Sequence, residues 1–134
     1  MLDLVDDSLD GLGLLVVLGN QFAALKVLLT ADCVKGARDL AAPAGALRKT
    51  AAQKVSDEAS VQSEIACVLT LGERSTGDFL DTCMALTTTL PLTLAALGAG
   101  TISWSHARVM VEETMNLDPA GAAALEAEGV RLIV

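Results

Sequence analysis

A very short break between two helical patterns constrains the fold of this chain more than any other feature. Ile65, Val68 and Leu69 fall on one face of a predicted helix. The following segment, residues 71–74, is long enough only for a turn. We expect Gly72 to adopt the left-handed conformation that ends many helices. The sequence therefore predicts two helices joined by a tight turn.

The second of these helices follows at once. We expect Ser75 to cap it by accepting a hydrogen bond from the amide of Gly77 or Asp78. An apolar stripe at helical spacing contains Phe79, Leu80, Cys83 and Met84. Two helices joined in this way form the helix-turn-helix unit, whose second helix enters the major groove of DNA. A helical hairpin that serves only as a packing unit has the same pattern, so it is the alternative interpretation.

A second helical pair is predicted after a polar break. Pro91 suits the first turn of a helix, Gly98 and Gly100 end it, and Ser103 caps the next helix. The side chains expected to face inward on that next helix are Trp104, Ala107, Val109 and Met110. Trp104 is expected to be a core anchor rather than a platform for stacking bases.

The run AALGAGTISWSHARVMVEE, residues 95–113, resembles two known families. Gly100, Ile102, Ser103 and the run His106-Ala107-Arg108 resemble the corner that follows the helix-turn-helix of ParB-like partition proteins. The closer resemblance is to an actinobacterial domain of unknown function found upstream of HNH endonuclease modules, the mycobacterial REP-element repeat family. Its positions here are Glu64-Ile65-Ala66, Leu69, Leu90-Pro91, Thr93-Leu94-Ala95-Ala96-Leu97, Gly100, Ile102, Ser103, His106-Ala107-Arg108-Val109 and Glu112.

This resemblance covers residues 55–130 well. The first fifty residues resemble the family only in general character, with no matching motif. The resemblance implies a context, a mobile-element type protein associated with an HNH endonuclease, more than a mechanism. Together with the predicted helix-turn-helix, it leads us to expect a noncatalytic DNA-binding or DNA-positioning module. The alternative is a protein interaction or oligomerisation module without DNA binding. The chain ends on the apolar segment GVRLIV, so we expect its last helix to be interrupted and the nuclease module to lie outside this chain.

The composition predicts an all-α domain. Hydrophobic residues make up 52% of the 134 residues and aromatic residues only 2%, a mixture that favours helix packing over sheet. We expect one helical bundle of six or seven helices: a long helix over 1–42, a short basic helix over 46–54, a helix-turn-helix core over 56–113 and a C-terminal helix over 118–134. Ser56 and the pair Asp118-Pro119 are the expected starts of two of these helices.

The charge distribution limits where DNA could bind. The net charge of −8 and the pI near 4.4 oppose simple DNA binding, because nonspecific affinity comes mainly from lysine and arginine at phosphates. The cations of the one basic region are Lys26, Lys35, Arg38, Arg48, Lys49 and Lys54. Arg74, Ser75 and Thr76 are candidate nucleic-acid contacts because they lie where the predicted recognition helix begins. The further candidates are Arg48, Lys49, Lys54 and Arg108. For each of these, a helix cap or an ordinary solvated face is the alternative.

The first forty residues predict a long apolar helix. Leucine and other apolar residues recur at three- and four-residue steps over 12–42, with a possible bend near Gly19. The mean hydropathy of +0.52 is high, so this helix is expected to be either a homodimer seam or the spine of the bundle. The run from Leu12 to Ala31 is interrupted by Asn20, Gln21 and Lys26, and we expect it to be a buried helix rather than a membrane span.

The sequence offers little for catalysis. A single histidine and no tyrosine remove most pairs of nucleophile and base, and we expect no enzyme activity, no cofactor and no small-molecule substrate. His106 is expected to be structural, with its ring bonded to a backbone carbonyl. Cys33, Cys67 and Cys83 show no metal-binding spacing, so we expect buried, reduced thiols in a cytoplasmic protein.

Overall fold

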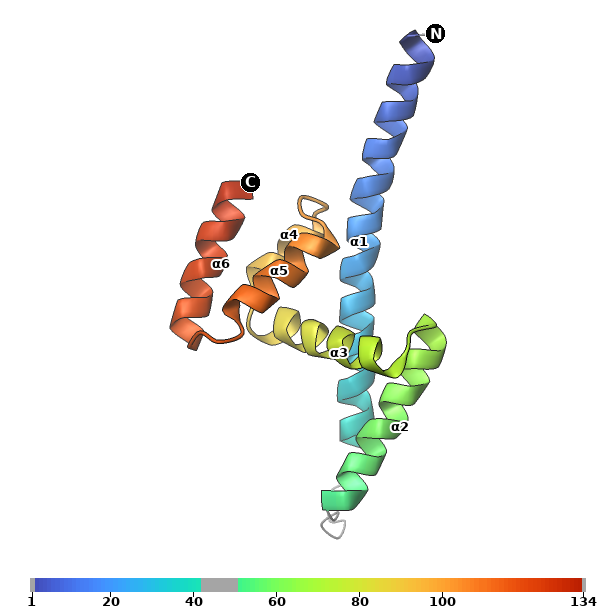
Figure 1. Ribbon diagram of the computed structural model, residues 1–134, viewed down its shortest axis with the longest axis vertical. Helices are drawn as coiled ribbons and strands as arrows, with labels where there is room; N and C mark the ends of the chain where they lie inside the picture. Colours follow the sequence, from blue (N-terminus) through green and yellow to red (C-terminus); the bar gives the residue numbers. More distant parts are fainter. Residues whose placement is uncertain (1, 42–50, 134) are drawn as a thin grey trace.

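The computed structural model describes the backbone of residues 2–41 and 51–133 and the side chains of residues 2–39 and 59–132. Six helices and no strand occur in this part of the chain, which confirms the predicted all-α class. Figure 1 shows five helices gathered around one half of a long N-terminal helix, whose other half extends beyond them.

The N-terminal helix α1 spans Leu2–Ala41 and passes through Gly19 without a break. It confirms the predicted long helix, but it begins ten residues before the apolar run at Leu12. Its buried side chains include Ala24, Val27 and Thr30, on a face that packs against α3 and α4. Only the second half of α1 therefore packs against the other helices.

Helix α2 spans Ala51–Leu69 and α3 spans Glu73–Thr88, so the predicted pair of helices around a tight turn is confirmed. The separate short helix over 46–54 is wrong in part, because residues 51–54 belong to α2, and residues 46–50 lie outside the described residues. Ser56 is inside α2 and is not its cap. Val68, expected to face inward, is 82% exposed, whereas Ile65 is buried.

Helix α3 lies at the centre of the bundle and contacts α1, α2, α4 and α5. It buries Cys83 and Leu86 together with two threonines, Thr76 and Thr82. Each threonine hydroxyl donates to the carbonyl four residues earlier in the same helix, at 2.8 Å for Thr76 and 2.9 Å for Thr82. These side chains therefore enter the core with their hydrogen bonds already made.

Helices α4 (Pro91–Gly98) and α5 (Trp104–Thr114) form the second predicted pair. Pro91 is at the first position of α4, as expected. Gly100 follows with φ of +80°, and the amides of Gly100 and Thr101 bond back to the carbonyls of Leu97 and Ala96. This pattern is a Schellman ending, which favours glycine at the residue with positive φ. In α5, Ala107 is buried as expected, whereas Val109 is 54% exposed and its predicted inward position is wrong.

The corner at Gly100 lies directly against α1. A Cβ atom on Gly100 would lie 2.6 Å from Cγ1 of Val17. The backbone carbonyl of Gly100 accepts a hydrogen bond of 3.4 Å from the side-chain amide of Asn20. This corner marks the point along α1 where packing by the bundle begins. Residues 2–16 of α1 therefore project past it (Figure 1).

Helix α6 spans Pro119–Ile133 and begins at the predicted Asp118-Pro119 signal, with Asp118 Oδ1 accepting from the amide of Gly121 at 2.7 Å. Glu126 in this helix is only 2% exposed. Its Oε1 accepts a hydrogen bond of 2.7 Å from the amide of Thr93, in the first turn of α4. The first turn of α4 has no cap from its own Leu90, so a carboxylate from another helix supplies it.

Replacing Glu126 should therefore destabilise the fold. Glu126→Ala leaves the buried amide of Thr93 without its acceptor, and we expect the free energy of unfolding to fall by about 1–3 kcal/mol. Glu128→Ala on the same helix is the matched control. It removes only an exposed ion pair with Arg131 and should cost at most about 0.5 kcal/mol. Urea unfolding of both variants measures the difference, and equal losses would contradict the proposed capping role.

Candidate interaction surfaces

The turn between α2 and α3 is built differently from the sequence prediction. The amides of Thr70 and Leu71 bond back to the carbonyls of Cys67 and Ala66, which is a Schellman ending. The residue with positive φ is Thr70, at 54°, and not Gly72, whose φ is −69°. Gly72 is instead the N-cap of α3. The expected cap at Ser75 is therefore wrong, because the helix begins two residues earlier.

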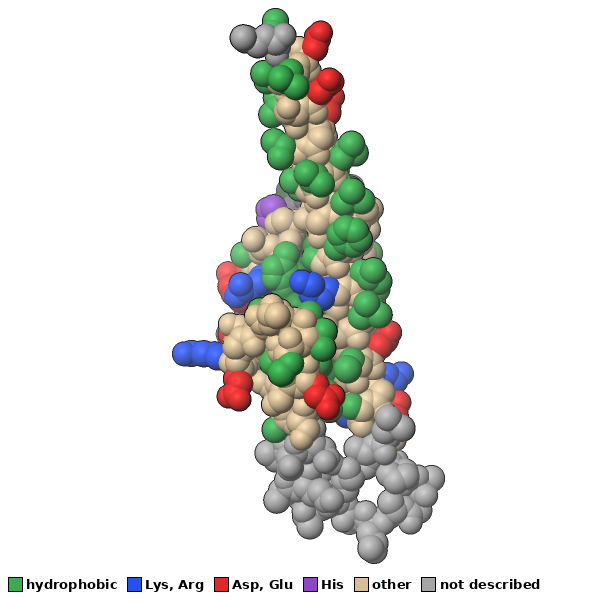
Figure 2. All heavy atoms as spheres, turned by 90° about the vertical axis from the view of Figure 1, so that its right-hand side faces the viewer, with side chains coloured by type: hydrophobic (Ala, Val, Ile, Leu, Met, Phe, Trp, Pro, Cys, Tyr) green, Lys and Arg blue, Asp and Glu red, His purple; other side chains and the backbone are tan. Residues whose placement is uncertain are grey.

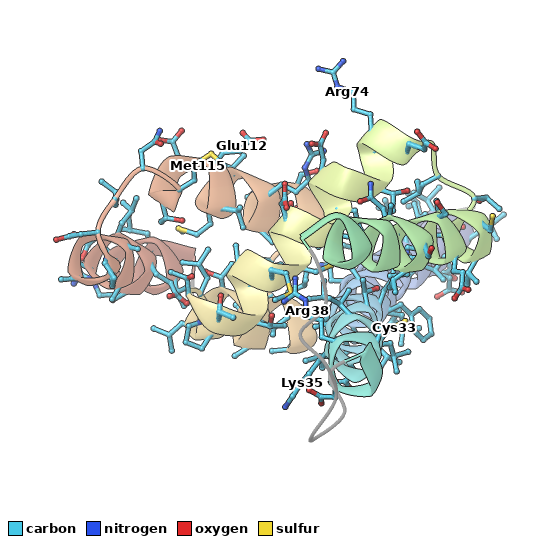
Figure 3. All side chains as sticks on the ribbon, turned by 90° about the horizontal axis from the view of Figure 1, so that it is seen from below. Cys33, Lys35, Arg38, Arg74, Glu112 and Met115 are labelled. Atoms are coloured by element: carbon cyan, nitrogen blue, oxygen red, sulfur yellow. The ribbon has the colours of Figure 1, made fainter. Side chains whose placement is uncertain are left out.

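The first turn of α3 exposes two of its three predicted DNA contacts. Arg74 and Ser75 are exposed, and Figure 3 shows the Arg74 side chain pointing away from the helices. Thr76 is fully buried, and its hydroxyl is bonded to the carbonyl of Gly72. The prediction for Thr76 is wrong, because a side chain inside the core cannot reach a base or a phosphate.

The exposed side of α3 is acidic. Glu73, Asp78 and Asp81 are all exposed there, and Arg74 is the only cation of this helix. Asp78 and Asp81 also line a groove of about 570 Å³ between α3 and α5, together with Glu112 and Arg108. Three carboxylates in one groove repel phosphate groups.

Arg108, another candidate contact, faces Glu112 one turn later. The two side chains lie 3.8 Å apart and are 54% and 64% exposed. This is a surface ion pair, and it partly neutralises Arg108. Arg108 is therefore a weak candidate for a phosphate contact.

Lys35, a cation of the basic region whose side chain the structure describes, does not extend the surface around Arg74. Arg48 and Lys49 lie outside the described residues, and Lys54 belongs to α2 with a side chain that is also outside them. Lys35 and Arg38 are exposed near the end of α1. In Figure 3, Arg74 and Lys35 point to opposite sides of the molecule, so these two cations cannot share one face.

His106 has the structural role that was expected, with different bonding. Its Nδ1 accepts from the backbone amide of Ser103 at 3.3 Å, and its own amide donates to the Ser103 hydroxyl oxygen at 3.2 Å. The ring therefore bonds to an amide, not to a carbonyl, and completes a capping box at the start of α5. Trp104 packs on Phe79 with ring centroids 5.6 Å apart, which confirms its expected role as a core anchor.

The cysteines differ from the expectation of three buried thiols. Cys33 and Cys67 are exposed, and only Cys83 is buried. Burial raises the pKa of the Cys83 thiol from 9.0 to about 12, and the charge of Lys26 lowers it by a smaller amount. Cys83 therefore stays protonated and unreactive at neutral pH. No group of three or more His, Cys, Asp or Glu side chains that could hold a metal ion occurs within the described residues.

The apolar surface of α1 bears on its two predicted roles, a homodimer seam or the spine of the bundle. Its apolar run was also expected to be buried, yet most of its large apolar side chains are exposed. They are Leu2, Leu4, Val5, Leu9, Leu12, Leu14, Leu15, Val16, Val17, Leu18, Phe22, Leu25, Leu28 and Leu29. Figure 2 shows a line of hydrophobic side chains along the side of this helix that it presents. The bundle covers one face of α1, so the remaining apolar surface has no cover from the described part of this chain.

Helix α1 is also long and apolar enough to cross a membrane. Within Leu2–Asp39, an 18-residue stretch has a mean hydropathy of 1.9, and 11% of that stretch is buried. Helices α3 and α4 are long and apolar enough only when they are taken together, and they are bent by 102° at their junction. Length and composition alone do not distinguish such a helix from one that packs against protein.

Comparisons of this chain with known protein families, with curated proteins and with solved structures found no match. The resemblance to the REP-element repeat family therefore stays a prediction.

The turn before α3 generates a stability prediction. A β-branched residue with positive φ is strained, so Thr70→Gly should raise the free energy of unfolding by about 1 kcal/mol. Ser105→Gly, at an exposed position of α5, is the control and should lower it by about 0.5 kcal/mol. Thermal and urea unfolding measure both, and a loss of stability in Thr70→Gly would contradict this geometry.

Proposed function

We propose that this chain is a noncatalytic helical module that associates with other copies of itself through α1. The observation that carries this proposal is the large apolar surface of α1 that faces away from the bundle. Phe22, Leu15 and Leu29 are 65%, 64% and 61% exposed, and a helix that is apolar on all sides is normally covered by something.

The charges of α1 favour another copy of the chain as this cover. Four aspartates lie within the first ten residues, whereas the other end carries three cations, Lys26, Lys35 and Arg38, and two aspartates, Asp32 and Asp39. When two copies run in opposite directions, the acidic end of each helix lies beside a half that is close to neutral and holds cations, whereas parallel copies would place both acidic ends together.

A lipid bilayer is a poorer cover for this helix. The stretch without charges, residues 11–25, would be about 22 Å long, and a hydrocarbon core is about 30 Å thick. The second half of that stretch also lies where the bundle packs, at Val17, Asn20 and Ala24. Crossing a membrane would require either burying aspartates in lipid or separating α1 from α3 and α4.

Self-association can be measured directly. Sedimentation velocity and light scattering over a range of concentrations should show the full chain as a dimer or higher oligomer. Phe22→Asp places a charge in the apolar surface and should raise the dissociation constant at least about a hundredfold. Val68→Asp, at an 82% exposed site on α2, is the control and should leave association unchanged. A chain that stays monomeric at every concentration would overturn the proposal.

DNA binding is a second candidate function, supported by the exposed Arg74 at the start of α3. Gel shifts across salt concentrations test it. If DNA binds, Arg74→Ala should weaken binding and lower the salt slope by about one unit, whereas Arg131→Ala should not. The Arg48/Lys49/Lys54 triple alanine variant should lose binding altogether. Absence of binding at low salt would exclude this candidate.

A further inference from the structure

We propose that two copies of this chain pair through α1 as antiparallel helices, in a register that places Leu18 of one copy against Phe22 of the other. This inference rests on the proposed self-association and specifies its geometry. It follows from the spacing of the exposed side chains, their position opposite the bundle and the charges along the helix.

The exposed apolar side chains of α1 include a regular seam. Its members recur at alternating steps of three and four residues, which is the spacing of helices that pack along their length. We define the α1 seam as Leu15, Leu18, Phe22, Leu25 and Leu29, which are 64%, 46%, 65%, 50% and 61% exposed.

The α1 seam lies on the free side of the helix. At about 100° per residue, it is roughly half a turn away from Ala24, Val27 and Thr30, which pack against the bundle. A second helix can therefore dock on the seam without displacing α3 or α4. The line of hydrophobic side chains in Figure 2 runs along this accessible side.

The acidic end of α1 favours the antiparallel direction. In a parallel pair the aspartates within the first ten residues of both copies would lie side by side. Asp32, at the position that continues the seam after Leu29, would also meet its own copy in the interface. Like charges in contact oppose pairing, so the parallel arrangement is disfavoured.

The antiparallel register follows from the seam and the charges together. With Leu18 against Phe22, Leu15 lies against Leu25 of the second copy in the same apolar seam. Asp32 then faces Ser8, which is polar.

The positions on one flank of the seam also match in this register. Leu14 lies beside Leu28, and Asp7 lies beside Lys35. Each pairing occurs twice because the two copies are related by a two-fold axis. The acidic projecting end of each helix thus meets the half of the other that carries Lys26, Lys35 and Arg38 together with Asp32 and Asp39.

The extent of packing by the bundle agrees with this arrangement. The corner at Gly100 reaches α1 at Val17 and Asn20, so residues 2–16 project from the bundle. In the antiparallel pair, the projecting segment of each copy runs alongside the supported half of the other. Each free segment therefore gains a partner that its own bundle does not provide.

Disulfide trapping between two different variants tests the direction and register. The background carries Cys33→Ser and Cys67→Ser, and it keeps the buried Cys83, which is 1% exposed. Leu15→Cys is made in one sample of this full chain and Leu25→Cys in another. After mixing and mild oxidation, we expect mainly the mixed disulfide, because these two positions face each other. Each variant oxidised by itself should form little dimer, because its two cysteines would lie about 15 Å apart along the helix.

The outcomes separate this inference from the proposed function. Disulfides within each variant by itself would indicate parallel helices and overturn the inference. A dimer in light scattering without any trapped disulfide would overturn the register but leave self-association standing. A chain that is monomeric without the cysteine substitutions would overturn both.

A charge exchange gives a second measure that keeps the seam intact. Asp7→Lys and Lys35→Asp should each raise the dimer dissociation constant about tenfold, because each places like charges together twice. The double variant should return to within about threefold of the original value. Asp10→Lys has the same change in net charge away from the seam and serves as the control. Failure of the double variant to recover would overturn the register.

Discussion

The contact of α1 with α3 and α4 is the interaction on which the rest of the structure depends. Ala24 and Val27 form its buried face, and the small side chain of Ala24 lets the helices approach closely. The Gly100 corner closes this contact at Val17, where a side chain on residue 100 would collide with α1. Because the contact ends there, the same geometry that fixes the bundle also leaves the first part of α1 without cover.

Features set by local chemistry could be predicted from the sequence. Pro91 marks a helix start through its fixed φ and missing N–H, whereas Ser103 and Asp118 mark helix starts through hydrogen bonds of their own side chains. Each was found where it was expected. The turn before α3 was predicted from its length, but its left-handed residue was not. A Schellman ending depends on which carbonyls end the preceding helix, and nothing in the sequence indicated Thr70 rather than the nearby glycine.

The candidate site was less predictable because its properties depend on which neighbours cover each face. Thr76 and Arg74 are two residues apart, yet one is buried under other helices and the other points into solvent. The apolar run of α1 suggested burial, because an apolar helix is normally covered by other chain segments. The sequence could not indicate whether its cover comes from the same chain. Charge could be read directly from the sequence, and the net charge of −8 already opposed simple DNA binding.

The threonines of α3 have a consequence for how this bundle can change. Their hydroxyls bond within their own helix, so the surrounding helices need to supply no acceptor. Apolar side chains that contact α3 can therefore be replaced by others of similar shape without leaving a threonine hydroxyl unpaired. Glu126 has no such freedom, since its carboxylate bonds to the backbone of α4. Sequence drift should thus be easier around the middle helix than at the junction of the last helix with the fourth.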